Sequence, residues 1–163
     1  MSVPEQVKTI IAEERFETAW PDMQALLEQH WRELSNFPDI PLQVDEADYR
    51  QLAQAKKLCL ITARTEGNHL VGYVVFLVSH NRHYATSRQA VQDVFYVDPA
   101  FRNHGLGRDL IDGAERTLRA RGVQVVYHHV KLSHPALGHL LAKCGYARVE
   151  TIFARRLDQE DVE

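Results

Sequence analysis

Long apolar runs are missing from this chain of 163 residues. A helix that crosses a membrane needs about 20 consecutive apolar residues, and no stretch approaches that length, so we expect no membrane span. The amino terminus, from Met1 to Lys8, lacks the basic and then apolar order of a secretory signal peptide. We therefore expect a protein of the cytoplasm.

Cysteine and excess positive charge are scarce as well. Cys59 and Cys144 both lie in apolar stretches, which is typical of reduced core thiols. The net charge of −3 disfavours nucleic-acid binding, which needs a basic surface. His80 and His83 have no cysteine or carboxylate pattern beside them, so we predict no metal site. With 45% hydrophobic and 25% charged residues, the chain is expected to form one globular domain over residues 1–163.

The most informative stretch is a strand followed by a glycine-bearing turn and a helix. Val91–Val97 is rich in β-branched and aromatic residues, which predicts a strand, and Pro99 follows its end. Apolar residues recur every four positions from Leu106 to Leu118. This spacing predicts an amphipathic helix that ends before Gly122.

The turn between this strand and this helix is suited to bind phosphate. The first N–H groups of a helix have no internal acceptor and lie at the positive end of its dipole. Gly105 and Gly107 would let an anion approach the main chain, and Arg102 and Arg108 add positive charge. Two glycines alone would fit an ordinary, tightly packed turn equally well.

The whole stretch 97–107 resembles the acyl-CoA motif of the GNAT superfamily of N-acetyltransferases. It has a strand that ends in Val-x-Pro and continues with Arg-x-x-Gly-x-Gly. The resemblance implies acetyl-CoA as the acyl donor, an amine as the acceptor, and frequent homodimers. It implies that main-chain groups of Phe95, Tyr96 and Val97 meet the pantetheine arm. It further implies that the pyrophosphate meets the turn, at Arg102, Asn103, His104, Gly105, Leu106, Gly107 and Arg108.

The expected order of elements agrees with this family. Strands are predicted at Val7–Glu14, Leu58–Thr65, His69–Ser79, Val91–Val97, Val123–Val130 and, as one strand or two, Tyr146–Leu157. Helices are predicted at Thr18–Ser35, from an N-cap at Asp45 to about Lys56, from Leu106 to Arg121, and at Pro135–Cys144, with an acidic tail at Asp158–Glu163. The implied fold is a mixed α/β fold. It has a mostly antiparallel sheet, central strands that splay apart, and helices on both faces.

Two residues near the splay are candidates for proton transfer. Asp93 stands inside an apolar strand, where a carboxylate is costly without a purpose or a partner. A structural hydrogen bond to the neighbouring strand is the alternative role. His128 and His129 lie on the next strand and point to opposite faces. His129 is the stronger candidate, because His128 shares its face with two valines.

The general acid of the family has no counterpart here. Leu141 occupies the position of the usual tyrosine, and leucine cannot donate a proton. The leaving thiolate would be protonated by His134, His139 or Tyr146, or it would leave unassisted.

The sequence as a whole therefore predicts an acetyl-CoA-dependent N-acetyltransferase that acts on the amine of a small molecule. A protein amine is the second choice of acceptor. A non-catalytic acyl-CoA-binding protein is the competing class, because of Leu141.

Overall fold

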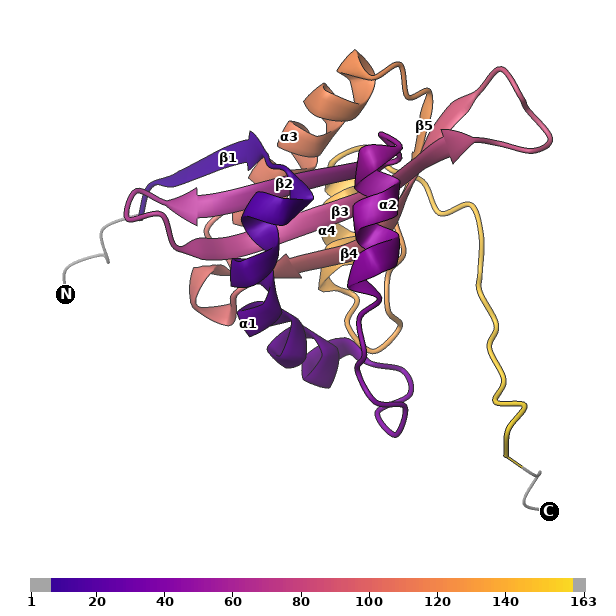
Figure 1. Ribbon diagram of the computed structural model, residues 1–163, viewed down its shortest axis with the longest axis horizontal. Helices are drawn as coiled ribbons and strands as arrows, with labels where there is room; N and C mark the ends of the chain where they lie inside the picture. Colours follow the sequence, from indigo (N-terminus) through magenta and orange to yellow (C-terminus); the bar gives the residue numbers. More distant parts are fainter. Residues whose placement is uncertain (1–6, 160–163) are drawn as a thin grey trace.

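A five-stranded sheet with helices on both faces forms the body of the protein (Figure 1), in a computed structural model that describes residues 7–159. The strands, in their order across the sheet, are β1 (Thr9–Glu13), β2 (Leu58–Thr65), β3 (Leu70–His80), β4 (Arg88–Val97) and β5 (Val125–Tyr127). The helices are α1 (Phe16–Leu34), α2 (Glu46–Gln54), α3 (Leu106–Ala120) and α4 (Ala136–Lys143), with a 3-10 turn, η1 (Pro99–Phe101), after β4. All neighbouring strands pair antiparallel except β4 and β5, which are parallel. The predicted mixed, mostly antiparallel sheet is confirmed.

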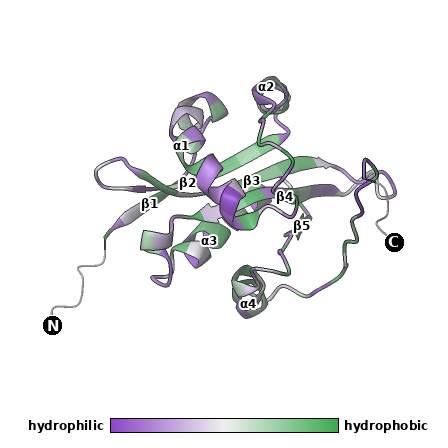
Figure 2. Cartoon of the chain, turned by 90° about the horizontal axis from the view of Figure 1, so that it is seen from below, coloured by the Kyte–Doolittle hydropathy of each residue, from purple (hydrophilic) through white to green (hydrophobic). Residues whose placement is uncertain are grey.

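Two cores cover the two faces of the sheet, with α1 and α2 on one side and α3 and α4 on the other (Figure 2). Alternation along β3 sends Tyr73 and Val75 into the core beneath α1. The intervening Val74 and the following Phe76 enter the core beneath α3. Because both faces are covered, β3 reads as an almost continuous apolar run.

The local signals for the helix ends are confirmed. The Asp45 side chain accepts a hydrogen bond from the Asp48 N–H at 2.9 Å, so Asp45 is the N-cap of α2. Helix α3 ends at Ala120, and Gly122 takes up a φ of +74° just beyond it.

The prediction of strands after α3 is wrong in two places. The strand expected at Val123–Val130 is only Val125–Tyr127, because β5 pairs with β4 at three positions and then diverges. The strand or pair of strands expected at Tyr146–Leu157 is absent from the described residues, where this stretch is extended chain without a ladder. Strand propensity produces a strand only where a neighbouring strand supplies the hydrogen bonds.

Both cysteines are free thiols, Cys59 buried and Cys144 half-buried. None of the helices within residues 7–159 is long and apolar enough to span a membrane. Positions 160–163 of the expected acidic tail lie outside the described residues.

Candidate active site

The edge of β4 opens where β5 leaves it. The last parallel pair joins Val91 to Tyr127, so among the described residues the remaining part of β4 has a neighbouring strand on the β3 side alone. The Asp98 N–H donates to Val71 O in β3 at 2.9 Å. Since neighbouring residues of a strand point their main-chain groups to opposite sides, those of Phe95 and Val97 point toward the opening. The sequence analysis expected Phe95, Tyr96 and Val97 to meet the pantetheine arm, but the main-chain groups of Tyr96 face β3 and are not part of this open edge.

A glutamine side chain stands at the point of divergence. The buried Gln92 donates through Nε2 to the main-chain oxygen of His129 at 3.3 Å. Its Oε1 lies 2.7 Å from Nδ1 of His128. Main-chain pairing between the two strands is thus replaced by one side chain, which holds them apart. Gln92 is part of the site architecture, and the sequence analysis missed it. Its polar side chain within an apolar strand was the available signal.

The turn before α3 presents a row of unused main-chain donors. In the described chain, no backbone acceptor is found for the N–H groups of residues 103–108, and the first helical bond comes from Asp109 to Gly105 O at 3.1 Å. Asn103, His104 and Gly105 are all exposed. These donors surround the positive end of α3, which is the geometry that holds a diphosphate.

Glycine is needed at the two positions of the turn for different structural reasons. Gly105 has a φ of +86°, and a Cβ atom there would meet nothing within 4 Å, so the space above it is open. At Gly107 a Cβ atom would lie 3.0 Å from Cδ2 of Leu140 in α4. Gly105 therefore leaves open space beside the free N–H groups, and Gly107 allows α4 to pack closely against the start of α3.

The two arginines of the motif also differ. Arg108 is exposed, with its Nε 3.7 Å from the Asp112 carboxylate. The Arg102 guanidinium instead binds the Glu33 carboxylate of α1 with two hydrogen bonds, of 2.6 and 2.9 Å. Its Nε donates to Val97 O at 2.8 Å. The side chain of Arg102 therefore ties α1 to the turn and does not point toward the free N–H groups.

The ion pair of Arg102 and Glu33 predicts a specific dependence of stability on pH. Hydrogen bonds from Arg102 hold the pKa of Glu33 below its usual range, so the folded protein binds this proton less readily than the unfolded chain. The stabilisation is complete above the unfolded pKa of about 4.3 and is lost as the pH falls through the lower folded value. We expect Glu33→Gln to lower the free energy of unfolding at neutral pH by about 1 kcal/mol. We also expect it to flatten the loss of stability below about pH 5, measured by thermal melts at stepped pH.

Glu28→Gln is the matched control for this prediction. Glu28 pairs with Arg32 on the same helix, but both side chains are largely exposed, at 64% and 70%, and such pairs contribute little. Its melting curves should follow those of the unmodified protein. If Glu33→Gln and the unmodified protein lost stability in parallel as the pH fell, the ion pair would not stabilise the fold.

Asp93 is the extra residue of a β-bulge. Val94 pairs with Val75 and Gln92 pairs with Phe76, so no β3 residue faces Asp93. A bulge redirects its side chain, and the Asp93 carboxylate is exposed, which makes the expected burial wrong. It accepts a short hydrogen bond from the Tyr49 hydroxyl of α2.

Tyr49 is a second residue that the sequence analysis missed, and its position after the Asp45 N-cap carried no signal of a role in a site. Burial and the hydrogen bond to Asp93 raise the pKa of Tyr49, so its hydroxyl stays protonated and acts as a donor. The cavity beside Tyr49 is apolar and measures about 30 Å³, roughly the share of one water molecule in the liquid. This cavity is therefore too small for an amine substrate, and the Asp93 carboxylate is exposed to solvent instead.

The two histidines after β5 have separate environments. His128 packs edge-on against Phe76, Phe95 and Tyr146. Burial lowers the pKa of His128 to about 4, so this ring is neutral at neutral pH. His129 is exposed and contributes its main-chain oxygen to the contact with Gln92. Of the pair, only His129 has an exposed side chain.

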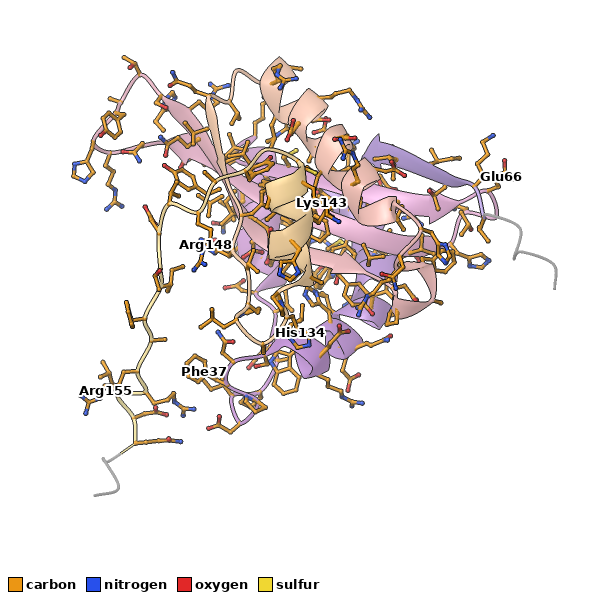
Figure 3. All side chains as sticks on the ribbon, turned by 180° about the vertical axis from the view of Figure 1, so that it is seen from behind. Phe37, Glu66, His134, Lys143, Arg148 and Arg155 are labelled. Carbon is orange, nitrogen blue, oxygen red and sulfur yellow. The ribbon has the colours of Figure 1, made fainter. Side chains whose placement is uncertain are left out.

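The side chains considered as proton donors to the thiolate have different surroundings. Leu141 is buried, with 5% of its surface exposed. The Tyr146 hydroxyl donates to Glu115 Oε1 at 2.9 Å, and burial together with this contact raises the pKa of Tyr146. His134 and His139 are exposed near α4, with His134 toward the end of α1 in Figure 3. Across residues 7–159, no three His, Cys, Asp or Glu side chains are grouped to hold a metal ion.

The sequence model of the acetyltransferase (GNAT) family matches residues 20–146, which include the sheet from β2 to β5 and the turn before α3. The chain belongs to this family. The protein is therefore an enzyme of the N-acetyltransferase class, as its strand, turn and helix had indicated.

Several solved structures share the fold of this chain. A ribosomal-protein-alanine N-acetyltransferase from Brucella melitensis biovar Abortus 2308 has a TM-score of 0.70 at 19% identity, covering 92% of this chain and 99% of its own. The aminoglycoside N-acetyltransferase AAC(6')-Iy, bound to a bisubstrate analogue of CoA and an acetylneamine, has a TM-score of 0.72 at 18% identity, with 91% and 97% covered. Glucosamine-6-phosphate N-acetyltransferase from Arabidopsis thaliana has a TM-score of 0.68 at 11% identity, with 93% and 99% covered. A search of curated proteins by sequence found no relative.

Proposed function

We propose that this enzyme transfers the acetyl group of acetyl-CoA to the amine of a small, positively charged molecule. The observation that carries the proposal is the exposed carboxylate of Asp93, redirected by the bulge and lying directly before the open edge of β4. A negative charge beside the end of the pantetheine path favours an acceptor that arrives as an ammonium ion.

The donor would bind along two neighbouring main-chain surfaces. The free N–H groups of residues 103–108 would hold the pyrophosphate, with the exposed Arg108 adding charge. The pantetheine amides would pair with the main chain of Phe95 and Val97, as an added strand does. AAC(6')-Iy, a protein of the same fold, has been solved with CoA bound.

The acceptor side would use Asp93 and Tyr49. The Asp93 carboxylate would hold the ammonium group and accept its proton, and the Tyr49 hydroxyl would keep the carboxylate oriented. The neutral amine would then attack the thioester carbonyl. A positioned base of this kind contributes about 10²- to 10⁴-fold to the rate.

The thiol of CoA would leave as a thiolate without a protein acid. A thiol has a pKa of about 8.5, so its thiolate is a tolerable leaving group at neutral pH. Leu141 is apolar and buried, and the Tyr146 hydroxyl is held by Glu115. Unassisted departure is therefore the mechanism that the placement of these side chains supports.

A screen of acceptors tests the proposed substrate class. Monoamines, polyamines, amino sugars and peptides with free amino termini would each be incubated with acetyl-CoA, following release of the CoA thiol with a chromogenic disulfide. We expect turnover with small cationic amines. For Asp93→Asn we expect the turnover rate to be lowered by about 10²-fold or more. Preferred turnover of peptides would make the enzyme a protein acetyltransferase instead. Acetyl-CoA binding without any turnover across the screen would contradict the proposal.

A further inference from the structure

Gln92 occupies the first position at which the ladder between β4 and β5 fails. The pairing ends at Val91 and Tyr127, so Gln92 and His128 would be the next pair. In place of a main-chain hydrogen bond, Nε2 of Gln92 donates to the main-chain oxygen of His129 at 3.3 Å. Neighbouring strands of a ladder lie about 4.8 Å apart. A side chain inserted between the two main chains holds them farther apart than this spacing.

The partners of the Gln92 amide fix its orientation. A main-chain oxygen only accepts hydrogen bonds, so the atom that faces His129 O is Nε2 of Gln92. Oε1 of Gln92 then lies 2.7 Å from Nδ1 of His128. Since Oε1 is also only an acceptor, Nδ1 of His128 carries the proton and donates. Gln92 is 6% exposed, and a buried amide with both ends satisfied is held in one conformation.

The His128 ring connects the Gln92 amide to the open edge of β4. It lies edge-on to three aromatic rings, with centroids 5.3 Å from Phe76, 5.0 Å from Tyr146 and 6.3 Å from Phe95. Phe95 is the residue of β4 whose main-chain groups point into the opening nearest to this ring. The three rings restrict the imidazole, and the imidazole in turn keeps the chain after β5 at its distance from β4.

A second buried glutamine of β4 shows the same side chain inside the continuous part of the ladder. Gln89 is 8% exposed and pairs with Val125 of β5. Its Oε1 accepts a hydrogen bond from Asn81 Nδ2 at 3.0 Å, and its Nε2 donates to Ser87 Oγ at 3.3 Å. Both partners belong to the connection from β3 to β4. Gln89 thus satisfies its amide within this hairpin, whereas Gln92 reaches across to the chain after β5.

We propose that Gln92 is a positioning residue for the acyl donor. Its side chain holds the gap between β4 and the chain after β5 open in the free enzyme, so that the pantetheine arm meets an edge that is already separated. An open edge otherwise tends to pair with the nearest chain, and a groove formed before binding raises affinity because the donor does not have to part the strands. The inference rests on the proposed function, which places the pantetheine amides on the main chain of Phe95 and Val97.

Gln92→Met keeps the length of the side chain and removes both hydrogen bonds. By titration calorimetry, we expect the dissociation constant for acetyl-CoA to rise about tenfold or more. At saturating acetyl-CoA, kcat should stay within about twofold, because the lost interaction acts on donor binding. Gln89→Met is the matched control: it removes two hydrogen bonds from an equally buried amide of the same strand, so it should lower stability but not donor affinity. Equal losses of affinity in the two variants, or unchanged affinity in folded Gln92→Met, overturn the proposal.

Gln92→Asn is a milder variant that tests the length of the side chain. It retains the amide but is shorter by one methylene, so it can keep its partners only if the chain after β5 moves closer to β4. Donor affinity should again fall. Hydrogen exchange of the Phe95 N–H, followed by NMR without acetyl-CoA, measures the gap itself.

We expect this exchange to slow by about tenfold or more in Gln92→Asn, as the gap closes, and not to slow in Gln89→Met. An unchanged exchange rate at Phe95 in Gln92→Asn overturns the proposal. If the unmodified chain did not bind acetyl-CoA, the proposed function would fail, and the exchange of the Phe95 N–H would still decide whether Gln92 holds the gap open.

Discussion

Gly105→Glu is expected to abolish most of the affinity for acetyl-CoA. The new carboxylate would stand in the open space above Gly105, where the free N–H groups of residues 103–108 are proposed to hold the pyrophosphate. Repulsion and the loss of one or two charge-assisted hydrogen bonds should cost about 3 kcal/mol. This corresponds to a dissociation constant raised about 10²-fold, measured by titration calorimetry with acetyl-CoA.

Gly105→Asn separates the effect of charge from that of backbone strain. Gly105 has a φ of +86°, and asparagine tolerates this region better than other side chains do. Asn103 in the same turn already has a φ of +65°. The Asn variant should lose less than about a tenth of the unfolding free energy and keep its affinity within about tenfold. If folded Gly105→Glu bound acetyl-CoA with the same affinity as the unmodified protein, the turn would not be part of the donor site.

Asp93→Asn should lower kcat/KM by about 10²-fold or more, the usual reach of a general base, while the affinity for acetyl-CoA stays unaltered. The amide keeps the shape of the carboxylate, and its oxygen can still accept the hydrogen bond from Tyr49. Since Asp93 is exposed, the melting temperature should change little. Steady-state kinetics with the best acceptor from the screen and calorimetry with acetyl-CoA measure the two effects.

Two neighbouring variants sharpen the test of Asp93. Tyr49→Phe keeps the charge but removes the orienting hydroxyl, and it should lower kcat/KM by roughly tenfold, in proportion to one hydrogen bond. Asp48→Asn removes an exposed charge next to Tyr49 and should leave the kinetics unchanged. Normal turnover with a lowered melting temperature in Asp93→Asn would make Asp93 a structural residue. The same loss of activity in His129→Ala would then identify the base.

The succession of strand, turn and helix from β4 to α3 could be predicted from the sequence because its signals are local. A strand of β-branched residues, the proline after it, the glycines and the four-residue apolar repeat all lie between Val91 and Leu118. Each of these signals acts through its own backbone dihedrals or its immediate neighbours. The same holds for the Asp45 N-cap, whose acceptor and donor are three residues apart. These features identified the family and the fold without any tertiary contact.

Only the tertiary structure shows which side chains lie at the candidate active site and which instead stabilise the fold. Arg102 could be assigned to the phosphate from its place in the motif, but it pairs with Glu33, 69 positions away. The bulge that exposes Asp93 depends on the register between β3 and β4, and Tyr49 reaches it from 44 positions away. Residues 147–155 have strand propensity but no strand in the described chain. Propensity is a property of the segment, whereas register, ion pairs and ladders depend on distant partners that only the fold brings together.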